Sequence, residues 1–480
     1  MGRNQSFDQR LTILSEALGK PVPRAGGRAA ALAQVIDVTD PTQVWLALAV
    51  MSGSLPSENE VVEISSLSAS AQAKVLLTAI AKATTKQTAI RNVRIVKGET
   101  VADVGHTAGA TFLTGIQRVV WETTRRWVRD HDVLLLGWSP EAKALRALTV
   151  AETERMARGS EAASMTVDDA QSETDLIVPW ECRYLITEVP AEPERLDLLR
   201  ALARFGHNTV NVLAHDLIPV TTSETVNAAA GMAYTFALYL SVIRYAKHIV
   251  AVSQASAVEY RGWARALAAL GEPVPQIAAV PLPFAAVEVS DQDLAQARQR
   301  FLVGDLPMVL VVGSHEPRKN HLAVLQAASL LWREGLFFSL TFIGGQSWAA
   351  DEFNQSLALL RAAGRPVESV TGVGEALLWS AYRLARFTVF PSLNEGFGLP
   401  VVESLSVGTP VITSNFGSMA ETAADGGCVL VDPRNDHALA AAMRRLLLDD
   451  QLVADLRAQA LSRPSRTWDD YAAQVWAAFS

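Results

Sequence analysis

Two glutamates in the second half of the chain, Glu395 and Glu403, have the spacing and surroundings of a ligand-binding loop. They lie eight positions apart in FTVFPSLNEGFGLPVVESLSVGTPVITS, where a hydrophobic strand precedes the first of them. Gly396 and Gly398 would let the backbone approach a ligand closely, and Pro400 suits the first turn of a following helix. The free N–H groups of such a helix start favour a diphosphate, and a carboxylate on its first turn can accept hydrogen bonds from a ribose diol. Alternatively, both glutamates only stabilise the helix start, an effect of about 0.3–1 kcal/mol.

A pair of adjacent cations follows another predicted strand. In VVGSHEPRKNHLAVLQA the hydrophobic run ends at Gly313, and Arg318 and Lys319 lie in the turn before a helix capped near Asn320. Two cations at such a place suit a leaving diphosphate, because charge-assisted hydrogen bonds contribute roughly 1.5–3 kcal/mol each. An isolated Arg-Lys pair is more often an ordinary solvated turn. The pair therefore indicates a diphosphate site only in combination with the two glutamates.

In the first half of the chain, His215 and Asp216 directly end a strand in NVLAHDLIPV. Ligands of open α/β sheets bind beyond the carboxyl ends of the strands, so both side chains would face a cleft. Two other interpretations stay open: His215 could be a structural core histidine, and Asp216 could cap the next turn.

A glycine-containing loop and a basic helix precede this strand, in DVGHTAGATFLTGIQRVVWETTRRWVRD. The loop ends at Gly115, and the helix is predicted to start near Ile116. A period of 3.6 residues gives this helix two faces, a basic one with Arg118, Arg125, Arg126 and Arg129, and an opposite one with Ile116, Val119, Val120, Thr123 and Trp127. The basic face could attract anionic lipid or a lipid-phosphate acceptor, although a solvated face is the commoner explanation.

These residues need strands to position them, and from about residue 93 predicted strands and helices alternate in the manner of parallel α/β sheets. We expect a helical N-terminal extension over 1–90, a first Rossmann-like lobe over 91–290 completed by a C-terminal helix over 465–480, and a second such lobe over 291–464. Residues 151–175 are polar and acidic and are expected to form a surface insertion. The predicted strands are 100–104, 133–138, 209–215, 248–253 and 276–282 in the first lobe, and 307–314, 338–345, 367–370, 387–392, 410–414 and 428–432 in the second.

The Glu-x7-Glu motif with its GFGLP filling, together with a strand ending in G-x-x-x-P-R-K-N, resembles family-4 retaining glycosyltransferases of the GT-B fold. The resemblance covers nearly all of residues 300–480 and is weaker from about 100 to 290. It implies that Arg318 and Lys319 hold the donor diphosphate, that Glu403 binds the ribose and that Glu395 binds the donor sugar. It further implies sugar or phosphate contacts in the donor cleft from His215, Gly115, Arg118, Gly313, Gly344, Phe397, Gly398 and Leu399. The loop TGVGEALL (371–378), with Gly372, Val373 and Gly374, would hold the nucleobase through backbone contacts.

Composition narrows the class of function. The formal charge is −8, which argues against a general nucleic-acid binder. The two cysteines, Cys182 and Cys428, lie in apolar runs without metal-ligand spacing, so two reduced, buried thiols are expected. The first 20 residues are too polar for a secretory signal, and no run of 18 apolar residues occurs. We therefore expect a cytoplasmic protein, at most peripheral at the inner face of the membrane.

The combined prediction is transfer of a sugar from a nucleoside diphosphate sugar to a glycan or lipid-linked oligosaccharide, without metal or other cofactor. The Asp-x-Asp triplets at 130–132 and 291–293 end no strand, unlike a metal–diphosphate site. The T-G-I-Q-R-V and H-D-L-I-P segments resemble bacterial enzymes of surface-polysaccharide synthesis, for which GDP-mannose is the first donor to consider. The alternatives are a catalytically silent scaffold, a sugar-nucleotide epimerase and a glycosidase, the last requiring two carboxylates about 5–9.5 Å apart across the scissile bond.

Overall fold

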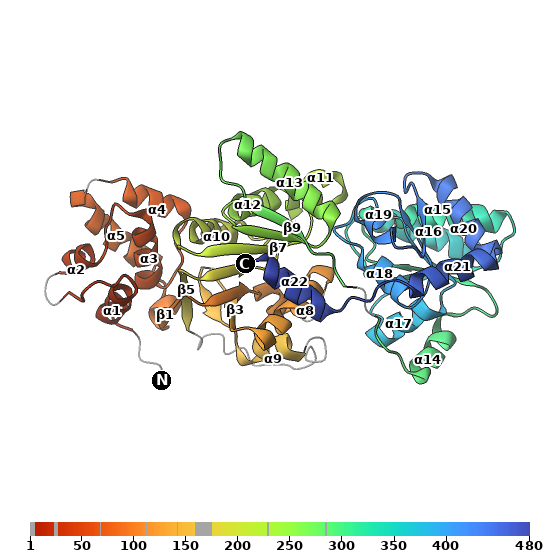
Figure 1. Ribbon diagram of the computed structural model, residues 1–480, viewed down its shortest axis with the longest axis horizontal. Coiled ribbons are helices and arrows are strands. Elements are labelled where there is room, and N and C mark those ends of the chain that lie inside the picture. The colour runs from red at the N-terminus through yellow and green to blue at the C-terminus, as the bar shows by residue number, and fades with distance from the viewer. Residues whose placement is uncertain are drawn as a thin grey trace.

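The computed structural model places three parts in a row along the long axis of the molecule (Figure 1). A group of N-terminal helices is followed by a nine-stranded sheet and then by a six-stranded sheet, both covered by helices. The structure describes residues 5–23, 27–67, 69–110, 114–141, 143–158, 175–227, 230–283 and 286–480. The predicted α/β fold, with two Rossmann-like lobes and a helical N-terminal extension, is confirmed.

The N-terminal helices share one hydrophobic core with the first sheet. Every residue of α3 from position 44 to 52 is buried, because this helix is apolar on all faces and lies among its neighbours. The ring of Trp45 stacks on that of Trp180 in the sheet, with centroids 6.3 Å apart. The extension is therefore packed onto the sheet. Its helices are α1 (Phe7–Ala17), α2 (Arg28–Val35), α3 (Pro41–Ser52), α4 (Glu58–Ser65), α5 (Ala69–Ala83) and α6 (Lys86–Ala89).

The nine-stranded sheet has the order β1-β5-β4-β3-β2-β6-β7-β8-β9. Only β4 is antiparallel to its neighbours, and the order changes direction between β2 and β6. The loops that follow these two strands therefore diverge and open a crevice at the carboxyl edge of the sheet. The strands are β1 (Val93–Lys97), β2 (Thr100–Asp103), β3 (Val133–Trp138), β4 (Leu145–Ala147), β5 (Leu176–Trp180), β6 (Arg183–Ile186), β7 (Thr209–Ala214), β8 (His248–Ala251) and β9 (Gln276–Ala279).

Helices on both faces cover this sheet, because parallel strands must be connected by crossovers. They are α7 (Gly105–Gly109), α8 (Gly115–Asp130), α9 (Val150–Arg158), α10 (Pro193–Phe205), α11 (Ile218–Thr221), α12 (Met232–Ile243) and α13 (Gln254–Ala269), with the 3₁₀ turn η3 (Ser223–Thr225). The helix predicted from near Ile116 begins at Gly115, where Thr114 and Gln117 form a capping box. Of the surface insertion predicted over 151–175, the first part belongs to α9 and residues 159–174 lie outside the described residues.

The six-stranded sheet is parallel throughout and has the order β12-β11-β10-β13-β14-β15. Numbered from its own first strand, this is the 3-2-1-4-5-6 order of a dinucleotide-binding fold, with the switch point between β10 and β13. The strands are β10 (Met308–Val312), β11 (Ser339–Ile343), β12 (Val367–Val370), β13 (Phe387–Phe390), β14 (Val411–Ser414) and β15 (Cys428–Val431). Its helices are α14 (Asp291–Phe301), η5 (Pro317–Lys319, a 3₁₀ turn), α15 (His321–Arg333), α16 (Asp351–Ala362), α17 (Glu375–Leu384), α18 (Leu399–Ser406), α19 (Gly417–Ala423), α20 (Asp436–Leu448) and α21 (Asp450–Leu461).

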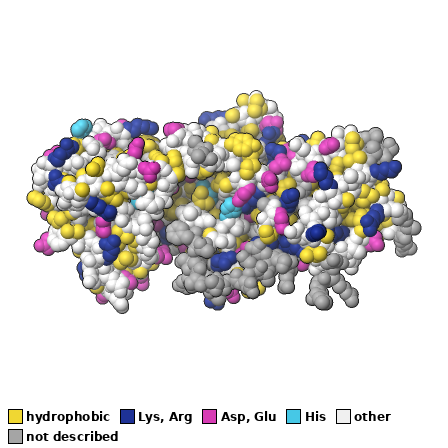
Figure 2. Space-filling view, turned by 180° about the vertical axis from the view of Figure 1, so that it is seen from behind, with side chains coloured by type: hydrophobic (Ala, Val, Ile, Leu, Met, Phe, Trp, Pro, Cys, Tyr) yellow, Lys and Arg dark blue, Asp and Glu magenta, His cyan; other side chains and the backbone are white. Residues whose placement is uncertain are grey.

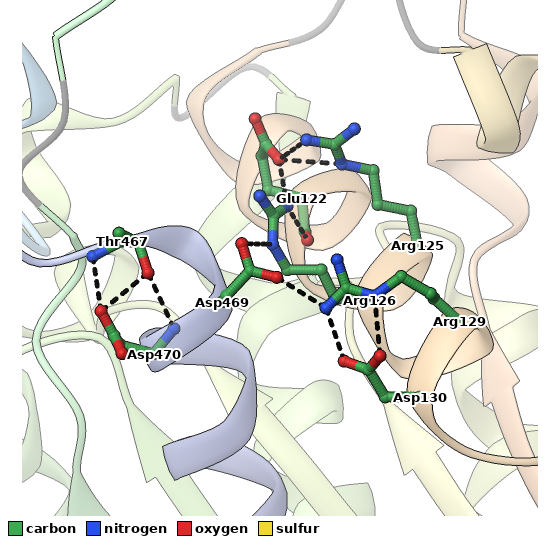
Figure 3. A network of polar contacts seen from close by, with 8 residues as sticks. All are labelled: Glu122, Arg125, Arg126, Arg129, Asp130, Thr467, Asp469 and Asp470. Atoms are coloured by element: carbon green, nitrogen blue, oxygen red, sulfur yellow. Dashed lines mark hydrogen bonds and ion pairs between the residues drawn. The ribbon is translucent and has the colours of Figure 1, made fainter.

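The last helix, α22 (Trp468–Ala478), returns from the second lobe and packs against α8 of the first. Trp127 Nε1 donates to the carbonyl of Ala472 at 3.0 Å, and the rings of His131 and Trp476 stack with centroids 3.9 Å apart. Arg126 and Arg129 of α8 reach the Asp469 carboxylate across this contact, as Figure 3 shows. The chain therefore crosses between the lobes twice, once before α14 and once before α22.

The eleven predicted strands all occur, but β1, β4, β5 and β6 were not predicted. β4 has three residues, too few for a clear alternation. β5 contains Pro179, which lacks the N–H that a strand interior normally needs. Its place beside the edge strand β1 and the antiparallel β4 makes that loss tolerable.

Candidate active site

The switch point of the six-stranded sheet brings together the cation pair and the first glutamate. Arg318 and Lys319 lie in η5 after β10, and Glu395 lies in the loop after β13, the neighbouring strand. Parallel neighbours end at the same edge, so segments 76 positions apart in sequence meet there. The sequence identified both segments but not their contact.

Glu395 receives both cations directly. Arg318 Nη1 and Lys319 Nζ each lie 2.6 Å from one of its carboxylate oxygens, and the Ser392 hydroxyl donates to one oxygen at 2.7 Å. Arg318 also pairs with Glu316 at 3.0 Å and donates to the backbone carbonyl of Asn394 at 2.9 Å. Glu395 and Arg318 are therefore each held in place by several partners.

The electrostatics of the cluster favour a charged carboxylate. Burial alone would raise the pKa of Glu395, but Lys319 and Arg318 oppose it and lower that pKa to about 2. For Arg318, burial lowers the guanidinium pKa, and the carboxylates of Glu395 and Glu316 more than reverse this effect. The Glu395 carboxylate is therefore ionised at neutral pH and lies between two basic side chains at the end of a strand.

Glu403 is the fifth residue of α18 and contacts the opposite lobe. Arg118 Nη1 lies 2.7 Å from one oxygen of its carboxylate, and the Tyr382 hydroxyl donates to the other at 2.9 Å. Arg118 belongs to α8 of the first lobe, so two residues predicted separately from distant segments form one ion pair between the lobes. Burial raises the pKa of Tyr382, and the Glu403 charge adds to that effect, so this hydroxyl remains a donor.

The start of α18 has the backbone that its sequence predicts. Gly398 is its N-cap with φ +97°, and Pro400 lies in the first turn. Gly398 has no side chain that could accept hydrogen bonds from the first N–H groups of the helix. Phe397 is buried in a cluster that also contains residues of the first lobe, and Leu399 packs against the same cluster. A Cβ built on Gly115 would lie 3.7 Å from Leu399, so the glycine that begins α8 faces the start of α18.

Gly396 serves a purpose that the sequence did not indicate. A Cβ at this position would come within 2.9 Å of the Asp216 carboxylate, which belongs to the first lobe. The missing side chain therefore permits close contact between the lobes, whereas close approach to a ligand was expected. Asp216 itself accepts a hydrogen bond from the Ile218 N–H at 3.1 Å, so the capping interpretation of this residue also holds.

His215 follows β7 and is 5 % exposed. Its Nε2 lies 3.2 Å from the carbonyl oxygen of Thr187, which makes Nε2 the protonated nitrogen. Burial lowers the pKa of His215 to about 4. The residue is therefore a neutral imidazole bonded within its own lobe, beside Asp216.

The remaining predicted glycines lie at strand ends around the cleft. Gly313 follows β10 with φ +147°, and a Cβ on Gly344 would overlap the Gly313 carbonyl, so this pair lets two loops cross closely. Gly372 and Gly374 follow β12, two strands away from β10, and a Cβ at either would meet nothing within 4 Å. Both therefore border open space beside the start of α17.

The basic face predicted for α8 is paired with carboxylates. Arg125 and Arg126 both contact Glu122, and Figure 3 shows Arg126 and Arg129 reaching Asp469 of α22. Arg126 and Arg129 thus join α8 to α22, whereas Arg125 pairs within α8. On the opposite face, Val119, Val120, Thr123 and Trp127 are buried, whereas Ile116 in the first turn is 39 % exposed.

Figure 2 shows the junction of the lobes from the other side, with charged and histidine side chains gathered around a hollow. Within the described ranges, no three or more His, Cys, Asp or Glu side chains are grouped as a metal site requires. None of the helices in the described part of the chain is long and apolar enough to cross a membrane. Three contributors to the site were missed by the sequence, namely Glu316, Ser392 and Tyr382. Glu316 and Ser392 lie within three residues of predicted ones, whereas Tyr382 reaches Glu403 only through the tertiary fold.

Comparison with known proteins gives a family match within the second lobe. Residues 294–463 match the family "Glycosyl transferases group 1". The serotype-specific mannosyltransferase WbdA of Escherichia coli is 27% identical over 263 residues, which are 53% of this chain and 30% of WbdA. The O-antigen chain mannosyltransferase B of Escherichia coli is 33% identical over 168 residues, 35% of this chain and 44% of that protein. The chain thus spans less than half the length of these relatives.

Solved structures share the whole two-lobed arrangement. Anabaena Alr3699/HepE in complex with UDP-glucose has a TM-score of 0.56 at 13% identity, with 79% of this chain and 98% of that chain covered. Sucrose-phosphate synthase from Thermosynechococcus elongatus has a TM-score of 0.55 at 17% identity, over 79% and 98% of the two chains. At these identities the likeness concerns the fold. The chain therefore has the GT-B fold, and residues 294–463 of its second lobe match the glycosyl transferases group 1 family.

Proposed function

We propose that this protein is a retaining glycosyltransferase that moves a sugar from a nucleoside diphosphate sugar to a hydroxyl of a glycan or lipid-linked oligosaccharide. The observation that carries the proposal is the convergence of Arg318, Lys319 and Glu395 at the switch point, beside the open N-terminus of α18. A switch point is where open α/β sheets bind nucleotides, and a helix N-terminus favours a diphosphate. The family of the second lobe supports the same reaction class.

In this proposal, Arg318 and Lys319 stabilise the diphosphate as its bond to the sugar breaks. An ammonium group has three hydrogens, and Glu395 accepts one from Lys319, which leaves donors for phosphate oxygens. The Glu395 carboxylate holds both cations in position and accepts from donor-sugar hydroxyls. Each carboxylate oxygen can accept two hydrogen bonds, so Glu403 can take ribose hydroxyls beside its bonds from Arg118 and Tyr382. Preorganised charges of this kind lower the barrier without a metal ion.

A mannosyl donor is the first choice, because WbdA and the O-antigen mannosyltransferase B carry that activity in their names. GDP-mannose is the first donor to test, and UDP-glucose is the second because HepE binds it. Synthesis of a cell-surface polysaccharide in the cytoplasm agrees with two free cysteines, which persist in a reducing compartment. A catalytically silent scaffold is the alternative, and the complete set of Arg318, Lys319, Glu395 and Glu403 argues against it.

Binding and turnover separate these candidates. Calorimetric titration with GDP and UDP should show binding of one of them, and a scaffold would bind neither. With donor and acceptor present, nucleoside diphosphate should be released only when the acceptor is added, whereas an epimerase would convert the donor without it. EDTA should leave the rate unchanged, and NMR of the product should show the anomeric configuration of the donor. Lys319→Ala and Glu403→Ala should each lower kcat/KM by about 10²-fold or more; full activity in both variants would refute this site.

A further inference from the structure

The N-terminus of α13 meets the second lobe instead of ending in solvent. The backbone N–H groups of Gln254 and Ala255 donate to the two carboxylate oxygens of Glu421, each at 2.9 Å. Glu421 belongs to α19 of the second lobe, 167 and 166 positions away. The first N–H groups of a helix lack partners within it, and a carboxylate is the partner that the helix dipole favours. The second lobe thus supplies a cap to a helix of the first.

The same helix start also binds the loop that carries Glu395. The hydroxyls of Ser253 and Ser256 donate to the Gly396 carbonyl oxygen at 2.6 and 3.1 Å. Both hydroxyls are buried, and Ser253 is the N-cap of α13. The start of α13 therefore contacts two separate segments of the second lobe. One is α19 with Glu421, and the other is the loop in which Gly396 directly follows Glu395.

These contacts lie beside the cleft because β8, which leads into α13, ends at the edge of its sheet that faces the second lobe. Two further contacts across the lobes flank them: the Asn394 amide donates to the Thr222 hydroxyl at 3.4 Å, and Gly396 packs against Asp216. Separation of the lobes would break all of them together. It would also carry Glu395 away from His215 and Asp216, which end the neighbouring strand β7.

We propose that Glu421, Ser253 and Ser256 form an interlobe latch, a set of positioning residues that holds the Gly396 loop against the first lobe during transfer. None of the three needs to contact a substrate. Their effect passes through the Gly396 carbonyl and the α13 N-terminus, and it sets how Glu395 and the start of α18 face the first lobe. The expected effect of the latch on kcat/KM rests on the proposed function. Its effect on the separation of the lobes does not depend on any activity.

Small-angle X-ray scattering and steady-state kinetics on the full chain test the latch. Glu421→Ala and the double variant Ser253→Ala with Ser256→Ala should each show a larger radius of gyration than wild type. Each should also lower kcat/KM by on the order of tenfold, the loss expected when charge-assisted or buried hydrogen bonds disappear. The Kd for the nucleoside diphosphate that wild type binds should change much less than kcat/KM, because the cation pair, Glu403 and the nucleobase loop belong to the second lobe. Only Gly115, Arg118 and His215 among the predicted donor contacts belong to the first. Glu421→Asp keeps the charge, so its radius of gyration and kcat/KM should both lie between those of wild type and Glu421→Ala.

Asp449→Ala is the matched control. It removes a carboxylate cap from α21, where Asp449 accepts from the Leu452 N–H at 2.9 Å, without touching the first lobe. It should lower thermal stability while radius and kcat/KM remain those of wild type. If both latch variants scatter like wild type and the control, the latch is refuted whatever the enzyme does. If they open and yet neither wild type nor variant releases nucleoside diphosphate from any donor, the latch stands and the proposed function falls.

Discussion

The Glu395 carboxylate lies between two cations, and its ionisation should be visible in the acid stability of the protein. Its pKa in the folded state is about 2, below the ordinary 4.5, so it stabilises the fold fully above about pH 4.5. That contribution, about 3 kcal/mol, is lost as the pH falls toward 2. Glu395→Gln should therefore unfold at lower urea concentration near neutrality and should lose less further stability between these pH values. Urea melts over a pH series measure this; an unchanged acid slope in the variant would contradict the ion-pair assignment.

His215 should also make the stability of the fold depend on pH, but in a different pH range. Its folded-state pKa is lowered because burial disfavours the charged ring, whereas that of Glu395 is lowered because two cations favour the charged carboxylate. Burial lowers the pKa of His215 to about 4 from the ordinary 6.5, so the folded state holds the neutral ring. The unfolded chain takes up the proton first, and this contribution to stability is full above about pH 6.5 and lost as the pH falls through 4. His215→Gln keeps an N–H donor for the Thr187 carbonyl but cannot titrate. Its free energy of unfolding should fall less steeply than that of wild type between these pH values, as fluorescence-monitored denaturation would show.

The types and strand-end positions of Arg318, Lys319 and Glu395 were readable from the sequence, but their mutual contact was not. Sequence spacing shows that each residue follows a strand. It does not show which strands are neighbours, and contact depends on that order. The Arg118–Glu403 pair is the clearer case, because it joins segments 285 positions apart from two different lobes.

At the scale of elements, the loop between β13 and α18 is shaped by the lobe opposite it. Gly396→Ala would place a Cβ 2.9 Å from the Asp216 carboxylate and 3.1 Å from its Cβ, so the loop or the lobes must move. Overpacking of this kind costs roughly 1–3 kcal/mol, and we expect kcat/KM to fall by about tenfold or more because Glu395 is the adjacent residue.

Gly262→Ala is the control for that substitution, since a Cβ there, inside α13, would meet only the Arg265 side chain at 3.9 Å. It should retain activity and gain about 0.5–1 kcal/mol, the helix preference for alanine over glycine. Thermal unfolding measures the stability of both variants, and steady-state kinetics with the donor measures their kcat/KM. Wild-type kinetics in Gly396→Ala would show that the lobes need no close contact at this point.

At the scale of the whole molecule, α22 fastens the end of the chain to the first lobe mainly by packing. Phe479 is 3 % exposed and its ring meets that of Trp127 with centroids 5.9 Å apart. Phe479→Ala should lower the free energy of unfolding by roughly 3–5 kcal/mol. Asp469 pairs with Arg126 and Arg129 (Figure 3), but its side chain is 52% exposed, so Asp469→Asn should cost less than about 1 kcal/mol. Denaturant melts of the two variants give both values, and equal losses would mean that the ion pairs hold this helix.

The sequence by itself determined eleven of the fifteen described strands, where those strands end and which residue types the ends carry. These features are local, because they depend on hydrophobic periodicity, helix caps and turn residues within about 20 positions. They were sufficient for two Rossmann-like lobes with a cation pair and glutamates after strands of the second, and the resemblance to a known family added the GT-B fold.

Only the tertiary structure decided what those residues touch. The strand order places η5 beside the Glu395 loop. Where the lobes meet, Glu403 forms an ion pair with Arg118, Gly396 packs against Asp216, and Glu421 accepts a hydrogen bond from the α13 N-terminus. The tertiary structure also paired Arg126 and Arg129 of the basic face of α8 with Asp469 of α22. Such pairings join residues far apart in sequence, and their energies depend on burial and on the partner. Neither is a local property of the chain.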